Sequence, residues 1–161
     1  MKYILLIAII CLIIFVIKIL PCKDFIEADN GNYYRARNKY SANKIDKLRE
    51  ISHDLINKLN KKDSIRLKNR LKNTSFGELM GGNKNIIAYN TDKGREIYIR
   101  LYNEKTNAPV DSELIIKALL HELAHSLVDN FGHGEEFENK DNELQKFRNF
   151  YLDKYTKKMK I

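Results

Sequence analysis

The stretch that decides the fold is His121-Glu122-Leu123-Ala124-His125. Positions four apart on a helix lie on one face, so the two histidines present their imidazoles to a common point, with Glu122 beside them. This is the H-E-x-x-H pattern, in which the histidines bind zinc and the glutamate acts as general base. We therefore expect His121 and His125 to be zinc ligands and Glu122 to be the catalytic residue.

A third ligand is expected after the motif, because a catalytic zinc ion takes three protein ligands and keeps one position for water. His133 is our first choice, since Gly132 and Gly134 give its loop the freedom to fold back. Glu143 is the alternative, because some enzymes with this motif use a downstream glutamate. Asp129, one turn beyond the motif, is a candidate to orient a ligand, and an ordinary surface position is the equal alternative. The chain has no cysteine from residue 23 onward, so any zinc must be held by histidine and carboxylate.

Hydrophobic periodicity predicts an α+β domain around the motif, with helices surrounding a small sheet. Ser41 and Asp111 are the expected N-caps of two of the helices. The motif helix carries a broad apolar face, which makes it a core helix. We expect helices at 41–59, 64–72, 112–130 and 135–155, a loop at 73–85, and a hairpin of strands 86–89 and 95–102.

The N-terminus is a separate apolar segment. Residues 3–20 are interrupted only by Lys18, and as a helix they span roughly 27 Å, enough for a hydrocarbon core. We expect a transmembrane anchor at 1–22, a tether at 23–40 and the catalytic domain at 41–161. A cleaved signal peptide is the alternative, but no small-x-small cleavage site follows the run. The Lys and Arg residues after the run favour a single-pass membrane protein with a cytoplasmic domain.

The formal net charge of +8 is unevenly distributed along the chain. Residues 41–72 hold ten Lys/Arg against four Asp/Glu (net +6), whereas residues 73–153 hold nine against fourteen (net −5). A solvated helix surface explains the basic segment most simply, and contact with anionic lipid or nucleic acid is the alternative. Because residues 41–72 contain no Phe, Tyr or Trp, base stacking by this segment is not expected.

Three segments give the chain a family likeness: Arg95–Leu101, Leu119–His125 and His133–Phe137. They resemble the WLM and SprT-like zinc metallopeptidases. The resemblance implies a minimal zincin-like fold that acts on protein or peptide substrates. It also implies that the substrate lies extended along an edge strand, which here would be Arg95–Tyr102. The ligands that it implies are His121, His125 and His133, with Glu122 as the base.

The function expected from these observations is that of a membrane-anchored zinc metalloendopeptidase. Two other classes remain: a catalytically silent zinc-binding interaction module, and a basic protein that binds a membrane surface or nucleic acid. The intact Glu122 argues against the first, because a silent module does not need the base.

Overall fold

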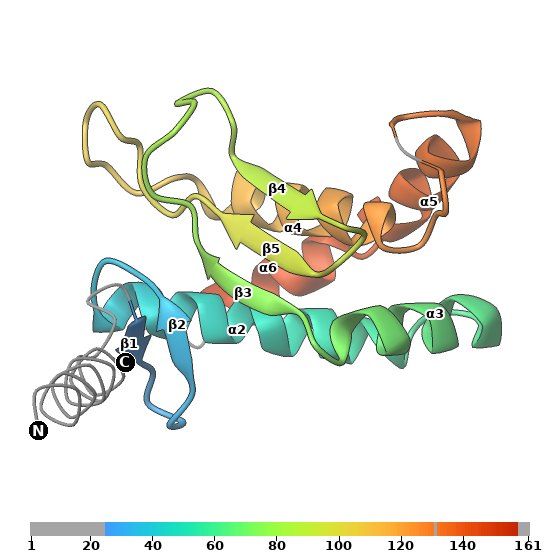
Figure 1. Ribbon diagram of the computed structural model, residues 1–161, viewed down its shortest axis with the longest axis horizontal. Helices are drawn as coiled ribbons and strands as arrows, with labels where there is room; N and C mark the ends of the chain where they lie inside the picture. Colours follow the sequence, from blue (N-terminus) through green and yellow to red (C-terminus); the bar gives the residue numbers. More distant parts are fainter. Residues whose placement is uncertain (1–24, 131, 158–161) are drawn as a thin grey trace, which may run out of the picture.

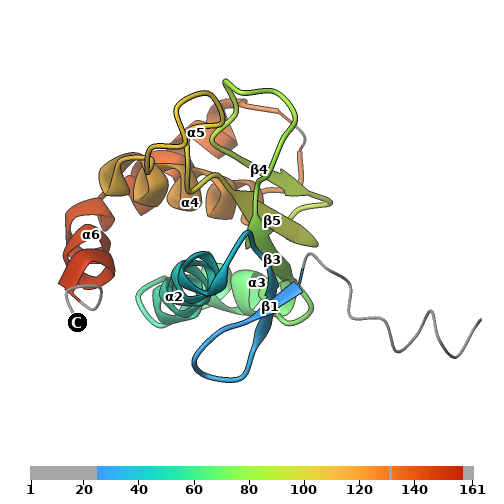
Figure 2. The same ribbon diagram turned by 90° about the vertical axis from the view of Figure 1, so that its left-hand side faces the viewer.

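The computed structural model describes residues 25–130 and 132–157, which form a mixed α+β domain as predicted. The described strands make one sheet in the order β1-β2-β3-β5-β4, and the described helices lie on one side of it (Figure 1 and Figure 2). The strands are β1 (Phe25–Glu27), β2 (Tyr33–Arg35), β3 (Ser75–Glu78), β4 (Ala88–Thr91) and β5 (Glu96–Ile99). The helices are α2 (Lys39–Ile56), α3 (Lys61–Leu71), α4 (Ser112–His125), α5 (Glu135–Gln145) and α6 (Arg148–Lys157).

The predicted transmembrane anchor at 1–22 lies outside the described residues. Within the described ranges, no helix combines the length and the apolar character that a membrane crossing needs. The predicted tether, 23–40, contains two strands, which begin at Phe25. There β1 and β2 form an antiparallel hairpin whose turn contains Gly31 at φ 83°, and β2 joins the main sheet beside β3. Strands of three residues are too short to show an alternating pattern in the sequence.

The hydrophobic core fills the space between the sheet and helices α2 and α4. Helix α2 packs on β1, β2 and β3, whereas α4 packs on β4 and β5. Asn38 caps α2 by accepting a hydrogen bond from the amide of Ser41 at 2.9 Å, so the helix begins before the predicted cap. The innermost side chains, each at most 1% exposed, include Ile45, Leu48, Ile51, Leu55, Ile97, Ile99, Ile116, Leu119, Leu120 and Leu123.

The predicted loop at 73–85 contains β3, and this changes the order of the sheet. The sequence of β3, Ser-Phe-Gly-Glu, has one large apolar residue and therefore gives no strand signal. β3 pairs parallel with β5, and β5 pairs antiparallel with β4, as the predicted hairpin requires. β5 is consequently an interior strand, and the prediction that Arg95–Tyr102 is the edge strand for a substrate is wrong. Among the described residues, β4 has no neighbour on its outer side.

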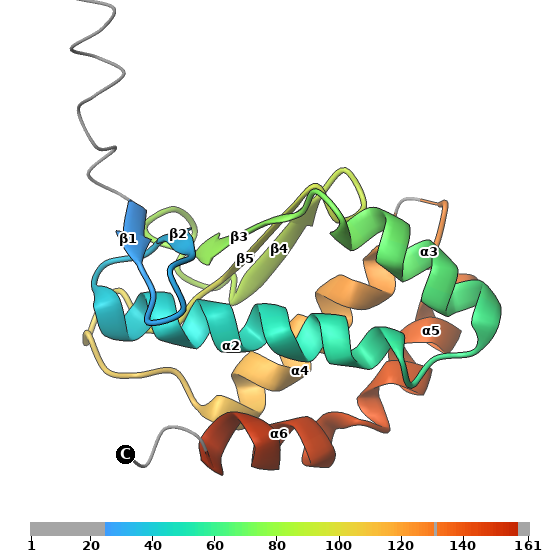
Figure 3. The same cartoon turned by 90° about the horizontal axis from the view of Figure 1, so that it is seen from below.

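The last part of the chain runs back along α4. The predicted helix at 135–155 is two helices, α5 and α6, which meet at Lys146 and Phe147. Figure 3 shows α6 beside the beginning of α4 and α5 beside its end. Arg148 at the start of α6 pairs with Glu113 at 3.7 Å. The sequence has no Gly or Pro at the break between α5 and α6. The break arises because both helices pack on α4, and hydrophobic periodicity alone does not reveal it.

Candidate active site

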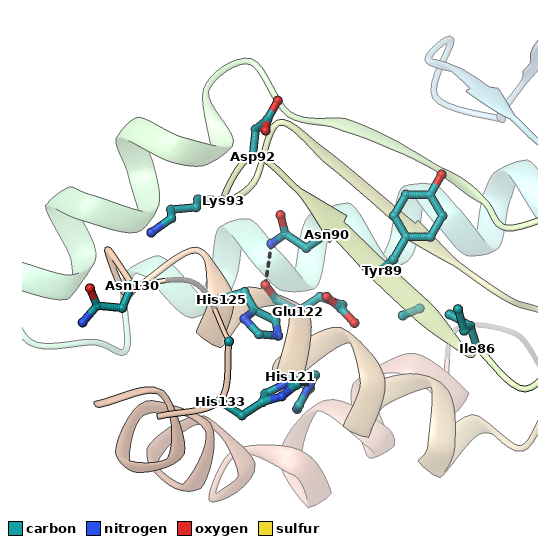
Figure 4. Close-up of a pocket in the computed structure, with 12 residues that line it drawn as sticks. Ile86, Tyr89, Asn90, Asp92, Lys93, His121, Glu122, His125, Asn130 and His133 are labelled. Atoms are coloured by element: carbon teal, nitrogen blue, oxygen red, sulfur yellow. Dashed lines mark hydrogen bonds between the residues drawn. The ribbon is translucent and has the colours of Figure 1, made fainter. Parts of the chain in front are cut away.

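Two of the predicted ligands lie on the last turns of α4 and the third comes from the loop before α5. The ligand nitrogens of His121, His125 and His133 all lie within 4.8 Å of one another. Nε2 of His133 is 3.2 Å from Nε2 of His121, and the ring of His125 stands almost perpendicular to that of His121 (Figure 4). The structure therefore brings the three predicted histidines to one point. The alternative ligand, Glu143, pairs with Lys140 at 2.9 Å and is not part of this group.

Helix α4 ends at His125, earlier than predicted, and this end returns the chain toward the site. The amide of Ser126 donates to the carbonyl of Leu123 at 3.0 Å, which tightens the final turn. Side chains from elsewhere then satisfy the carbonyls that follow: Arg66 donates to Leu127, and Lys93 donates to Val128 at 3.3 Å. Gly132 at φ 93° reverses the loop that carries His133.

Phe137 packs against all three imidazoles. Its ring centroid lies 4.2 Å from that of His125, 4.6 Å from that of His133 and 5.0 Å from that of His121. The side chain is buried in the first turn of α5. Its contact with the histidines follows from the packing of α5 on α4, which periodicity does not reveal.

Asp141 orients the ring of His121, one of the predicted ligands. It lies one turn after Phe137 on α5, and its Oδ2 is 3.1 Å from Nδ1 of His121. Its other oxygen accepts a hydrogen bond from Gln145 at 2.9 Å, which holds the carboxylate in place. The earlier candidate, Asp129, instead pairs with Arg66 at 2.9 Å and points away from this contact. Of the two alternatives for Asp129, the surface position is the one observed, and the carboxylate partner of His121 comes from a neighbouring helix.

Glu122 is buried beside the histidines, with 7% of its surface exposed. Burial raises the pKa of its carboxyl to about 7; His121 opposes this shift and Asp141 adds to it. For His125, burial and the neighbouring His121 and His133 lower the imidazole pKa to about 4. His125 is therefore neutral near pH 7, with a lone pair free for a metal ion. A carboxyl whose pKa is near neutrality suits a group that must both take and return a proton.

The three histidines and Glu122 line one pocket of about 420 Å³. Its opposite wall comes from β4, from the residues before that strand and from the turn after it (Figure 4). The wall is apolar at Ile86 and Ala88, and Lys93 and Asp92 lie toward its other end. An edge strand thus borders the space in front of Glu122.

The residues before β4 are held in place by a buried arginine. Arg100, 1% exposed, donates hydrogen bonds to the carbonyls of Ile86 at 2.9 Å and of Gly81 at 2.9 Å. Its remaining donors reach the carbonyl of Asn83 and the carboxylate of Glu104, the latter at 2.8 Å. Nothing in the sequence singled out Arg100, because an arginine in an alternating strand is usually on the solvent face.

The donor set fits zinc, because imidazole nitrogens are ligands that this ion prefers and three of them converge here. The fold and site together define a metallopeptidase-type protein: an H-E-x-x-H helix under a sheet, a convergent third histidine and a buried glutamate. The WLM domain model matches residues 35–158, so the chain belongs to the WLM family. The predicted WLM likeness is confirmed, and family membership supports a hydrolase of the zinc metallopeptidase type in general.

Two solved structures are similar to this chain, both of Wss1 from Saccharomyces cerevisiae. A Wss1 mutant is 26% identical, with a TM-score of 0.47, over 66% of this chain and 85% of that chain. The other Wss1 structure is 27% identical, with a TM-score of 0.46, over 65% of this chain and 82% of that chain. The search of curated protein sequences gave no match.

Proposed function

We propose that this protein is a zinc metalloendopeptidase in which His121, His125 and His133 hold the metal and Glu122 is the general base. When bound, zinc supplies Lewis acidity for the attack of water on a peptide carbonyl. The Glu122 carboxylate accepts a proton from the attacking water and returns it to the leaving amine. Asp141 keeps the His121 ring in one orientation, and Phe137 supports all three rings. The observation that carries the proposal is the buried carboxyl of Glu122 beside three convergent imidazoles in one pocket.

The substrate proposed for this site is an extended segment of a protein. β4 is the edge strand of the described sheet and borders the pocket, so its outer backbone groups can pair with an added strand. The scissile bond of a segment paired there lies between β4 and α4, in front of Glu122. The protein-substrate expectation made from the sequence is kept, with β4 in place of Arg95–Tyr102.

A direct test compares the full chain, purified in detergent, with Glu122→Gln. We expect wild type to bind about one zinc ion and to cleave an unfolded protein, whereas Glu122→Gln keeps the metal and loses cleavage. Glu113→Gln is a matched control, because it makes the same chemical change on the same helix at an exposed position. Full cleavage by Glu122→Gln would show that the base is misassigned. Zinc binding without cleavage by wild type would favour the silent module.

Membrane anchoring through residues 1–22 is part of the same proposal and is supported by the apolar run at 3–20. We expect the chain to stay with membranes after alkaline extraction, and a reporter fused after residue 161 to be on the cytoplasmic side. Release into the supernatant would refute the anchor and leave the metallopeptidase proposal intact.

A further inference from the structure

One side chain connects the edge strand to the backbone of the proposed base. Nδ2 of Asn90 on β4 donates to the carbonyl oxygen of Glu122 at 2.6 Å and to Oγ of Ser126 at 2.9 Å. Its Oδ1 accepts from the amide of Gly94 at 2.6 Å. The amide of Gly94 can only donate and the carbonyl of Glu122 can only accept, so the opposite orientation of the carboxamide would face like groups. Every polar hydrogen of the Asn90 side chain is used.

The carbonyl of Glu122 needs this partner because α4 stops so abruptly. In a continuing helix it would accept from the amide of Ser126, but that amide turns to Leu123 instead. The hydroxyl of Ser126 is 3.5 Å away, at the limit of a hydrogen bond. Asn90 therefore supplies the strong donor at a buried helix end, where an unpaired carbonyl is costly.

The turn after β4 fits tightly against the same helix end. Gly94 has φ 107°, and a Cβ added there would lie 2.9 Å from Oγ of Ser126. Because Gly94 also donates to Asn90, the turn, the strand and the end of α4 form one hydrogen-bonded unit.

We infer that Asn90 is a positioning residue that sets the distance between the substrate-binding strand β4 and Glu122. The inference rests on the proposed function. The histidines on α4 and Glu122 share one helix, so their mutual geometry does not depend on Asn90. The gap between α4 and β4 does depend on it. Loss of Asn90 should therefore impair hydrolysis of peptides that pair with β4 and spare peptides too short to reach it.

The test compares two peptides on the full chain. β4 has four residues and is roughly 13 Å long, so a peptide of about eight residues pairs along it, whereas a blocked dipeptide does not. The variants are Asn90→Ala and Asn90→Asp; aspartate keeps the shape and the acceptor for Gly94 but loses the donors. Asn73→Ala, the same chemical change at an exposed asparagine in the turn after α3, is the control. Zinc content and thermal unfolding are measured for each variant. If one Asn90 variant has a folding defect, the other one tests the inference.

We expect both Asn90 variants to keep zinc and to lose about tenfold or more in kcat/KM on the long peptide, because a misplacement of about 1 Å has effects of this size. On the short peptide we expect a change below about threefold. Asn73→Ala should stay near wild type on both peptides. Equal losses of kcat/KM on the two peptides, or no loss on either, would overturn this inference and leave the proposed function intact. If wild type cleaved neither peptide, the proposed function would be overturned, and the inference with it.

Discussion

The carboxylate of Asp141 lies 3.1 Å from Nδ1 of His121, while Nε2 of the same ring faces Nε2 of His133 at 3.2 Å. The two nitrogens of one imidazole thus have separate tasks. Nδ1 donates its proton to a carboxylate from α5, which fixes the tautomer and leaves the lone pair on Nε2. The end of α4 and the middle of α5 are therefore coupled through one ring.

Asp141→Asn should weaken zinc binding about 10- to 100-fold, because an amide holds the His121 ring less firmly and does not raise its basicity. Competition with a chelator of known affinity measures this change. Asp129→Asn is the control, since Asp129 is exposed and pairs only with arginines in the described structure. Unchanged zinc affinity in Asp141→Asn would mean that the contact has no role in metal binding.

Phe137→Ala should lower the free energy of unfolding of the metal-free protein by about 3–5 kcal/mol, because it removes a buried ring. It should also weaken zinc binding, since three imidazoles lose a common support. Phe150→Ala should change the unfolding free energy by less than about 1 kcal/mol, because Phe150 is 51% exposed and contacts Lys58. Denaturant unfolding with a chelator present distinguishes these outcomes.

The third ligand can be tested by comparing His133→Ala with Glu143→Ala. We expect His133→Ala to lose bound zinc on dialysis and Glu143→Ala to retain it, because only the first removes a nitrogen from the convergent group. Metal analysis after dialysis gives the answer without any assay of activity. Loss of zinc only in Glu143→Ala would reverse the assignment.

Arg100→Met should destabilise the fold by about 3–5 kcal/mol, since it removes a buried ion pair with Glu104 and the side-chain donor to the carbonyls of Ile86 and Gly81. Arg95→Met is the matched control, because the Arg95 side chain is 74% exposed and pairs only with Asp92 in the described structure. We expect less than about 0.5 kcal/mol for it. Urea unfolding of both variants measures the difference. Similar urea midpoints for Arg100→Met and Arg95→Met would show that the contacts of Arg100 do not stabilise the fold.

His53 should make stability depend on pH. Burial lowers its pKa below the usual histidine value of 6.5, and the nearby Arg49 lowers it further. The folded state therefore binds a proton less readily than the unfolded chain, and stability falls as pH drops below about 6.5. Wild type should lose more stability between pH 7 and pH 5 than His53→Gln. Parallel pH profiles from thermal unfolding would show that His53 is not responsible.

The part of the site that is local in sequence could be predicted, because helical spacing alone places His121, Glu122 and His125 together. His133 followed from the glycines that flank it. The residues that were missed act across elements: Asp141 reaches a neighbouring helix, and Asn90 reaches from strand to helix. Such pairs depend on how the helices pack, and no periodicity encodes that.

The same distinction applies to the fold. Long amphipathic segments such as α2 and α4 were visible, and so was the hairpin of β4 and β5. β1, β2 and β3 have at most four residues each and gain their stability from their neighbours. Because the sequence does not reveal β3, β5 is expected at an edge of the sheet. This is why the substrate was assigned to the wrong strand.

The strand order also determines where attachments to the protein lie. The described chain enters through β1 at one edge of the sheet, whereas the pocket opens beside β4 at the other edge. Four inter-strand spacings of about 4.8 Å separate these edges by roughly 19 Å. An immobilising support or a fused partner placed ahead of Phe25 would therefore hold the domain by its far side, with the cleft turned outward to arriving polypeptides.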